Sequence, residues 1–319
     1  MTAPRLLATL AILVPLGCAG ARAPQEGPGA SELERIERQL EGFYEPLFYL
    51  AEESRLAIED VMDHLKRDYV FPTDGPLPED ELRFWLFRSE NDLMPRNEEM
   101  VALIQARKTL AEGDTLPPIL NALVEHQRSW RELHRRWKEQ GVKYGWRSSS
   151  PFPRNLGTVL EREIARLKAR HAELLKQTPG AEARHLEKQI RELYGPLVRQ
   201  NRERALLMEQ FQEEFARKNH DPALRLLWNH QAFFPRNEET RRTIRENIHL
   251  AEGTGIPAGF LAFVNHWNPW KMERAWREEL GEAPPASSKH DFPQDEFAGA
   301  AEKTFQELSS RRIHLAAPR

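Results

Sequence analysis

Apolar residues recur along this chain at spacings of three and four positions, which is the periodicity of an amphipathic α-helix. One stripe near the start comprises Leu33, Ile36, Leu40, Phe43 and Leu47. Another in the second half comprises Leu186, Ile190, Leu193 and Leu197. No stretch alternates apolar and polar residues for long enough to indicate a sheet. We therefore expect an all-α fold.

Two halves of the chain repeat one another in sequence. Residues 95–99 read Pro-Arg-Asn-Glu-Glu, and so do residues 235–239. Across 95–130 and 235–270, about 15 of about 36 aligned positions are identical, which is far above chance. The sequence therefore predicts a tandem duplication of a four- to five-helix unit, forming a bundle-like array. Copy one is expected over 31–177 and copy two over 178–319, with the proline-rich stretch from Phe71 to Pro78 as an insertion in copy one.

Each copy is expected to hold helices of the same five kinds. These are an opening helix kinked at an internal proline, a short helix carrying a tryptophan, a third capped by asparagine, a fourth that starts at a proline, and a fifth. The residues concerned are Pro46, Trp85, Asn97 and Pro117 in copy one, and Pro196, Trp228, Asn237 and Pro257 in copy two. The fifth helices are expected over 154–175 and 294–312.

The composition agrees with solvated amphipathic helices, because 40% of residues are hydrophobic and 30% are charged. The formal net charge is −3, with acidic and basic residues interleaved, so no concentrated basic face predicts nucleic-acid binding. The chain has one cysteine, Cys18, and therefore no intrachain disulfide and no thiolate in the predicted folded body.

The N-terminus carries an export signal. Arg5 precedes an apolar run from Leu6 to Leu16, which is too short to span a bilayer. The segment 14–18, Val-Pro-Leu-Gly-Cys, resembles the lipobox of bacterial lipoproteins, although the position three residues before the cysteine, usually leucine, is Pro15. The resemblance implies a signal peptide over 1–17 and acylation of Cys18. Residues 18–30, rich in Gly, Ala and Pro, are then expected to be a flexible tether.

The resemblance also implies a location. A lipid on Cys18 would hold the protein at the cell envelope. Ala19 after the cysteine is similar to the outer-membrane sorting pattern of Gram-negative lipoproteins, which would place the protein on that membrane, facing the periplasm. The membrane would be one partner. An envelope protein or a small molecule is the other expected partner.

A histidine and a tryptophan lie four residues apart in each copy, and thus on one helix face. The pairs are His126 with Trp130 and His266 with Trp270. One interpretation is a ligand pocket walled by indole, with imidazole as polar contact or proton carrier. The other, which we favour, is an aromatic core stripe with a buried, hydrogen-bonded histidine.

Arg96 and Arg236 stand at the expected starts of the third helices, where exposed backbone donors could help them bind an anion. Capping by the following asparagine and glutamates explains the same pattern without a ligand, and we favour it.

No motif identifies a reaction, a cofactor or a metal site, and the histidines show no tight ligand spacing. We therefore expect a non-enzymatic interaction or ligand-binding module at the envelope. Two alternatives stay open. The first is an enzyme that uses His126 and His266 as acid-base groups, and the second is a purely structural envelope protein.

Overall fold

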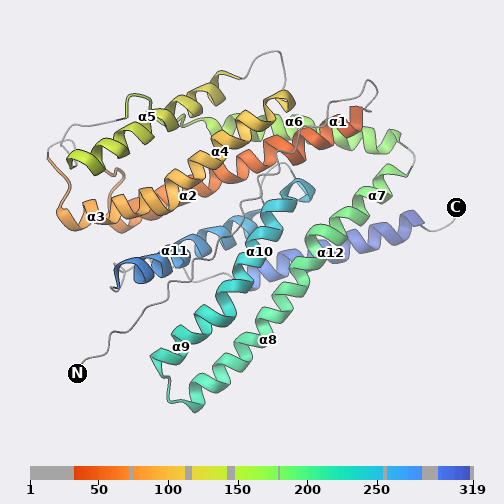
Figure 1. The fold of residues 1–319 in the computed structure, drawn as a ribbon. Helices are drawn as coiled ribbons and strands as arrows, with labels where there is room; N and C mark the ends of the chain where they lie inside the picture. The colour runs from red at the N-terminus through yellow and green to blue at the C-terminus, as the bar shows by residue number, and fades with distance from the viewer. Residues whose placement is uncertain are drawn as a thin grey trace, which may run out of the picture. The chain divides into compact units, whose positions relative to one another are not determined.

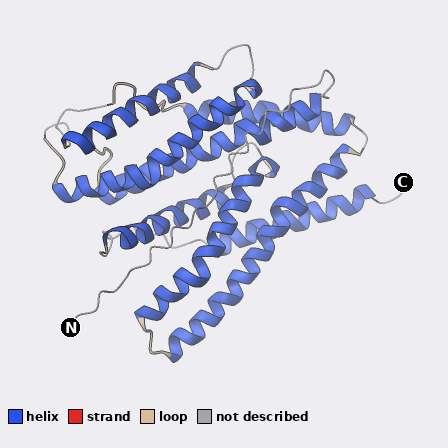
Figure 2. Cartoon of the chain, viewed as in Figure 1, coloured by secondary structure: helices blue, strands red, loops and turns tan. Residues whose placement is uncertain are grey.

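The chain folds as a succession of helices, and the described part contains no strand (Figure 2). The computed structural model describes residues 32–71, 75–111, 117–141, 148–178, 180–253, 257–281 and 294–316. The expected all-α class is confirmed. The signal peptide, the tether and Cys18 lie outside the described residues.

Residues from Ser31 onward form one compact unit, in which the elements run in two series. The first series is α1 (Glu32–Gln39), η1 (Leu40–Tyr44), α2 (Glu45–Leu65), α3 (Glu79–Arg88), η2 (Ser89–Leu93), α4 (Met94–Arg107), η3 (Lys108–Leu110), α5 (Pro118–Gln140) and α6 (Leu156–Gln177). The second is α7 (Ala181–Lys188), η4 (Gln189–Tyr194), α8 (Gly195–Arg217), α9 (Pro222–Trp228), η5 (Asn229–Phe233), α10 (Phe234–Asn247), η6 (Ile248–Leu250), α11 (Ala258–Leu280) and α12 (Gln294–Ala316).

The second series has the same kinds of element in the same order as the first. The connection from Leu65 to Glu79 is longer than that from Arg217 to Pro222, as an insertion in copy one requires. One contact also recurs: Gln39 donates to the carbonyl of Leu110 at 3.0 Å, and Gln189 donates to that of Leu250 at 2.8 Å. Duplication itself requires that the halves superpose, and it stays a prediction.

Four prolines inside helices each follow a π-helical turn, in which a backbone N–H bonds the carbonyl five residues back. The last donor of each turn is the residue directly before the proline, as in the bond from Glu45 to Leu40. The other donors, Met94, Gly195 and Phe234, behave in the same way. Proline has no N–H and crowds the preceding turn of an α-helix, so a widened turn accommodates its ring. The prolines are Pro46, Pro95, Pro196 and Pro235.

The expected N-caps at Asn97 and Asn237 are wrong. Both residues lie four positions into α4 and α10, and these helices continue from α3 and α9 through η2 and η5. Both side chains are buried, each 6% exposed. An asparagine followed by two glutamates is typical of a helix start, but here each asparagine lies inside a helix that continues through a π-turn. The fourth helices do begin after Pro117 and Pro257, as expected.

The main core is shared by the two series. From the first series it contains the buried apolar stripe of α1, η1 and α2 and the buried apolar residues of α4 and α6. From the second series it contains buried apolar residues of α7, η4, α10, α11 and α12. Helices α2, α4 and α6 lie side by side, with α5 next to α4 (Figure 1). A second cluster is rich in indole and joins α2, α3 and α5 to the C-terminal part of α11; its tryptophans are Trp85, Trp130, Trp137 and Trp276.

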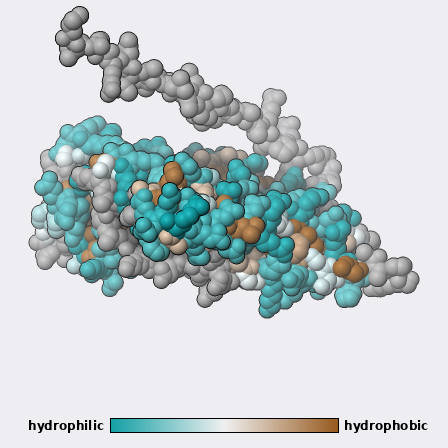
Figure 3. Space-filling model, turned by 90° about the horizontal axis from the view of Figure 1, so that it is seen from below, coloured by the Kyte–Doolittle hydropathy of each residue, from teal (hydrophilic) through white to brown (hydrophobic). Residues whose placement is uncertain are grey.

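Teal, hydrophilic residues dominate the face seen in Figure 3, and brown patches are scattered over it. None of the described helices is long and apolar enough to cross a membrane.

Candidate functional site

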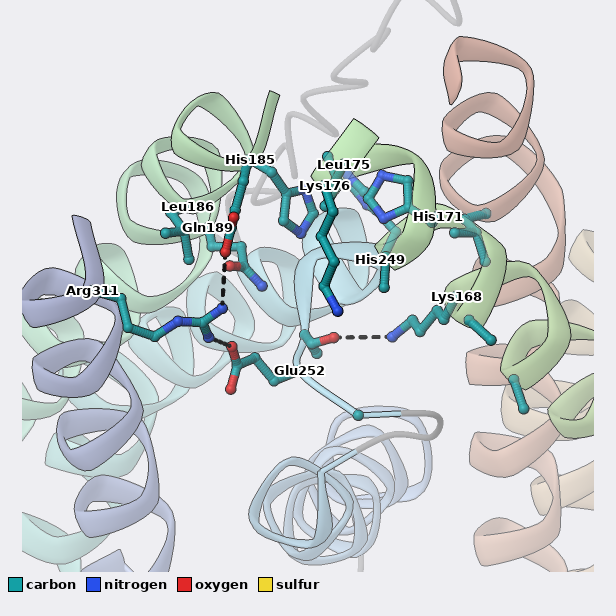
Figure 4. Close-up of a pocket in the computed structure, with 17 residues that line it drawn as sticks. Lys168, His171, Leu175, Lys176, His185, Leu186, Gln189, His249, Glu252 and Arg311 are labelled. Carbon is teal, nitrogen blue, oxygen red and sulfur yellow. Dashed lines mark hydrogen bonds and ion pairs between the residues drawn. The ribbon is translucent and has the colours of Figure 1, made fainter. Parts of the chain in front are cut away.

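A pocket of about 420 Å³ lies where α6, α7 and η6 come together, with α12 at one side (Figure 4). Three histidines line it, one from each of the first three elements: His171, His185 and His249. Lys168, Gln189, Glu252 and Arg311 contribute polar groups to the same pocket.

The short connection between α6 and α7 explains why two of these histidines meet. Thr178, in the connection, lies midway in the chain between His171 and His185. The chain reverses there, which brings the two residues together (Figure 1). The two rings contact one another edge to face, with centroids 4.9 Å apart.

Glu37 of α1 completes the cluster, because α1 lies beside α6. Its Oε1 is 3.3 Å from Nε2 of His171. This hydrogen bond lowers the pKa of Glu37 below its usual value. One ligand atom each from Glu37, His171 and His185 lie within 4.8 Å of one another, which makes this the group of described residues that could hold a metal ion.

Burial makes two of the imidazoles weak bases. Desolvation, together with the neighbouring charge of His171, lowers the pKa of His185 to about 4. Desolvation likewise lowers the pKa of His249 to about 4, although Glu41 opposes the shift from 3.5 Å. Both rings are therefore neutral at physiological pH, and each keeps one nitrogen lone pair for a ligand.

Two of the cations around the pocket, Lys168 and Arg311, are engaged by acceptors. Nζ of Lys168 lies 2.8 Å from Oε1 of Glu45 and donates to the carbonyl of Ala251 at 2.9 Å. Burial raises the pKa of Glu45 to about 7, with Lys168 opposing the shift. Arg311 pairs with Glu252 at 2.8 Å (Figure 4). The pocket thus combines an imidazole wall with a rim of both charges.

His126, predicted from the sequence, lies elsewhere, in α5. It is 9% exposed, and its Nδ1 is 2.8 Å from the carbonyl oxygen of Ser150. Its ring stacks on Trp130 and meets Phe152 edge to face. Burial lowers its pKa. These contacts are typical of a buried histidine whose hydrogen bond is made with a backbone carbonyl.

The equivalent pair of copy two is described only in part. His266 is half-buried on α11. The side chain of Trp270 lies outside what the structure describes. Its neighbour Trp267 is fully buried and donates its indole N–H to Glu238 at 2.8 Å.

Arg96 and Arg236 do not stand at helix starts, so no exposed backbone donors surround them. Arg96 is 6% exposed and pairs with Asp92 at 2.5 Å. Arg236 donates to the carbonyl of Ala232 at 3.2 Å. Neither arginine lines the histidine pocket.

Arg96 belongs to a buried chain of alternating charges between α2, α3, α4 and α10. Its members in spatial order are Asp60, Arg88, Asp92, Arg96, Glu53 and Arg241. Burial alone would raise the pKa of Glu53 and Asp92, but the adjacent guanidiniums outweigh it and lower both values. Every charge here has a partner of opposite sign, which is typical of a structural network.

The sequence contained a signal for the pocket that spacing rules did not detect. His171 and His185 stand at equal distances from a helix–helix connection, and His249 directly precedes the repeated Leu-Ala-Glu-Gly segment at 250–253. The ligands of known metal-binding motifs lie a few residues apart in sequence, whereas the residues of this cluster come from α1, α6, α7 and η6. Comparison with known protein families, curated proteins and solved structures finds no match for the chain.

Proposed function

We propose that this protein is a non-enzymatic ligand-binding protein of the bacterial cell envelope, anchored by lipid on Cys18, which takes its ligand in the histidine pocket. The observation that carries the proposal is the convergence of His171, His185 and His249, from separate elements, on one cavity of about 420 Å³. Pockets that bind small ligands combine apolar walls with a few convergent polar groups, and this one has both.

The pocket supports binding more than catalysis. An acid-base group works best with a pKa near the operating pH, whereas the pKa values of His185 and His249 are about 4. His126, the other acid-base candidate, is 9% exposed and engaged with a backbone carbonyl. A purely structural protein would have no need of a cavity lined with neutral imidazoles.

A variant that fills the cavity tests binding. Ala169 lines the pocket and is exposed at its edge, so Ala169→Trp would occupy the space without disturbing the core. Native mass spectrometry of the protein released from its own membranes should show a non-covalent adduct on the wild type that Ala169→Trp lacks. Equal adducts on both proteins, or none on either, would contradict the proposal.

Anchoring is tested separately, on the residue that the lipobox resemblance singles out. Labelled palmitate should be incorporated into the wild type and not into Cys18→Ser, and the variant should leave the membrane fraction. If Cys18→Ser remains with salt-washed membranes, lipid on this cysteine is not the anchor.

A further inference from the structure

We propose that Glu37, His171 and His185 bind one divalent first-row transition metal ion of the zinc class, with an open coordination position directed into the pocket. The inference rests on the proposed function, since it names the ligand of the same pocket. Its starting point is that three donors from α1, α6 and α7 offer ligand atoms within 4.8 Å of one another.

The separations suit a small tetrahedral ion. Zinc bonds to imidazole nitrogen and carboxylate oxygen are about 2.0–2.2 Å long, so the edges of a zinc tetrahedron are about 3.3–3.5 Å. Nε2 of His171 and Oε1 of Glu37 are already 3.3 Å apart. The rings of His171 and His185 are in contact, with centroids 4.9 Å apart, and the three ligand atoms lie within 4.8 Å of one another, so a metal ion would draw them closer by up to about 1.5 Å.

The donor set selects the class of metal. Two imidazole nitrogens and one carboxylate oxygen suit Zn²⁺ and its neighbours, whereas Ca²⁺ and Mg²⁺ take oxygen ligands. Three protein ligands leave a fourth position for a small ligand or for another side chain.

His249 lies outside this group of three but faces the same pocket. It lines the same pocket, its side chain is 9% exposed, and its Nε2 forms no hydrogen bond (Figure 4). The nearest acid is Glu41, whose Oε2 lies 3.5 Å from that nitrogen.

Acidic groups offset most of the positive charge around the cluster. Glu37 lies within it, and Glu41 pairs with Lys188 at 3.1 Å. Lys168 pairs with Glu45 at 2.8 Å. Lys176 also lines the pocket but is exposed, so its ammonium can turn to solvent when a metal ion binds.

The test is calorimetric titration of the detergent-solubilised full chain, freed of metal by a chelator, with zinc chloride. We expect one site. His171→Gln, His185→Gln and Glu37→Gln should each weaken zinc binding at least about 10-fold, since each removes a ligand. His314→Gln changes an exposed histidine of α12 and is the matched control, expected to stay within about 2-fold of the wild type.

Two further measurements keep the result interpretable. Co²⁺ should give the visible bands of tetrahedral nitrogen and oxygen coordination in the wild type and lose them in Glu37→Gln. The side chain of Glu37 is 45% exposed, so this variant should keep its fold even if His171→Gln does not. Zinc should also raise the thermal unfolding temperature of the wild type, because it binds the folded state alone.

No zinc binding up to about 100 μM would overturn the inference, and so would binding that survives in His185→Gln and Glu37→Gln alike. A different result would contradict the proposed function: wild type and Ala169→Trp would carry the same non-covalent adducts, or none, in native mass spectrometry. An adduct that Ala169→Trp removes, in a protein that does not bind zinc, would leave the pocket with a ligand of another class.

Discussion

Glu53→Gln should destabilise the fold strongly, because it removes a charge on which two buried arginines depend. Glu53 is 1% exposed and lies 2.9 Å from Arg241 and 3.4 Å from Arg96. The amide keeps the shape of the side chain but not its charge. Breaking a buried ion pair by removing one partner costs about 3–5 kcal/mol. At about 2–4 °C per kcal/mol, the unfolding temperature should fall by roughly 10 °C.

The assay is urea and thermal unfolding followed by far-ultraviolet circular dichroism. Glu59→Gln is the matched control: it lies on the same helix, α2, and pairs with Arg55 on the surface, where both side chains are nearly half exposed. Exposed helix pairs contribute about 0.3–0.5 kcal/mol. If Glu53→Gln costs no more than Glu59→Gln, solvent screens the network and our account of it is wrong.

Other perturbations have expected outcomes. Trp137→Ala, in the indole cluster and 4% exposed, should cost about 3–5 kcal/mol of unfolding free energy in the same assay. His126→Ala should cost about 1–3 kcal/mol, because the hydrogen bond to the Ser150 carbonyl and the ring contacts with Trp130 and Phe152 are lost, whereas exposed His314→Ala should change the unfolding free energy by less than about 0.5 kcal/mol. Titration of wild-type stability with acid should show a loss that begins below about pH 6.5, because His185 and His249 have pKa values of about 4 in the fold and take up protons more readily when unfolded; the raised pKa of Glu45 offsets part of this loss. The loss should continue below about pH 4, because Glu53 and Asp92 have lower pKa values folded than unfolded, and stability that does not fall would contradict these signs.

The helical class and the core stripes were predictable because they depend on local periodicity. Ile36, Leu40, Phe43 and Leu47 are all buried, as the pattern predicted. The start of α4 could not be predicted in the same way. Proline usually interrupts a helix, and the π-turn that accommodates Pro95 leaves no simple pattern of residues.

The candidate site was not predictable from spacing, because its members are far apart in the chain. Glu37 and His171 meet only when α1 lies against α6, and His249 joins them through η6. The sequence directed attention instead to His126, whose helical spacing from Trp130 proved to be that of neighbours in a core. The sequence repeat directed attention to paired residues, whereas the three histidines of the pocket have no histidine counterpart in the aligned repeat.

The π-turn η1 has a consequence for the chain's tolerance of insertions and deletions. Such a turn is equivalent to one extra residue in an otherwise regular helix, and one residue corresponds to about 100° of rotation. Deleting one codon within 40–44 would restore regular α-helical winding between α1 and α2. Because the widened turn absorbs the extra residue, the helix on either side would keep nearly the same rotation about its axis. Glu37 would still face His171, but Pro46 would lose the widened turn that accommodates its ring. The π-turn therefore allows one continuous helix to carry both a proline and a carboxylate that faces the histidine pocket.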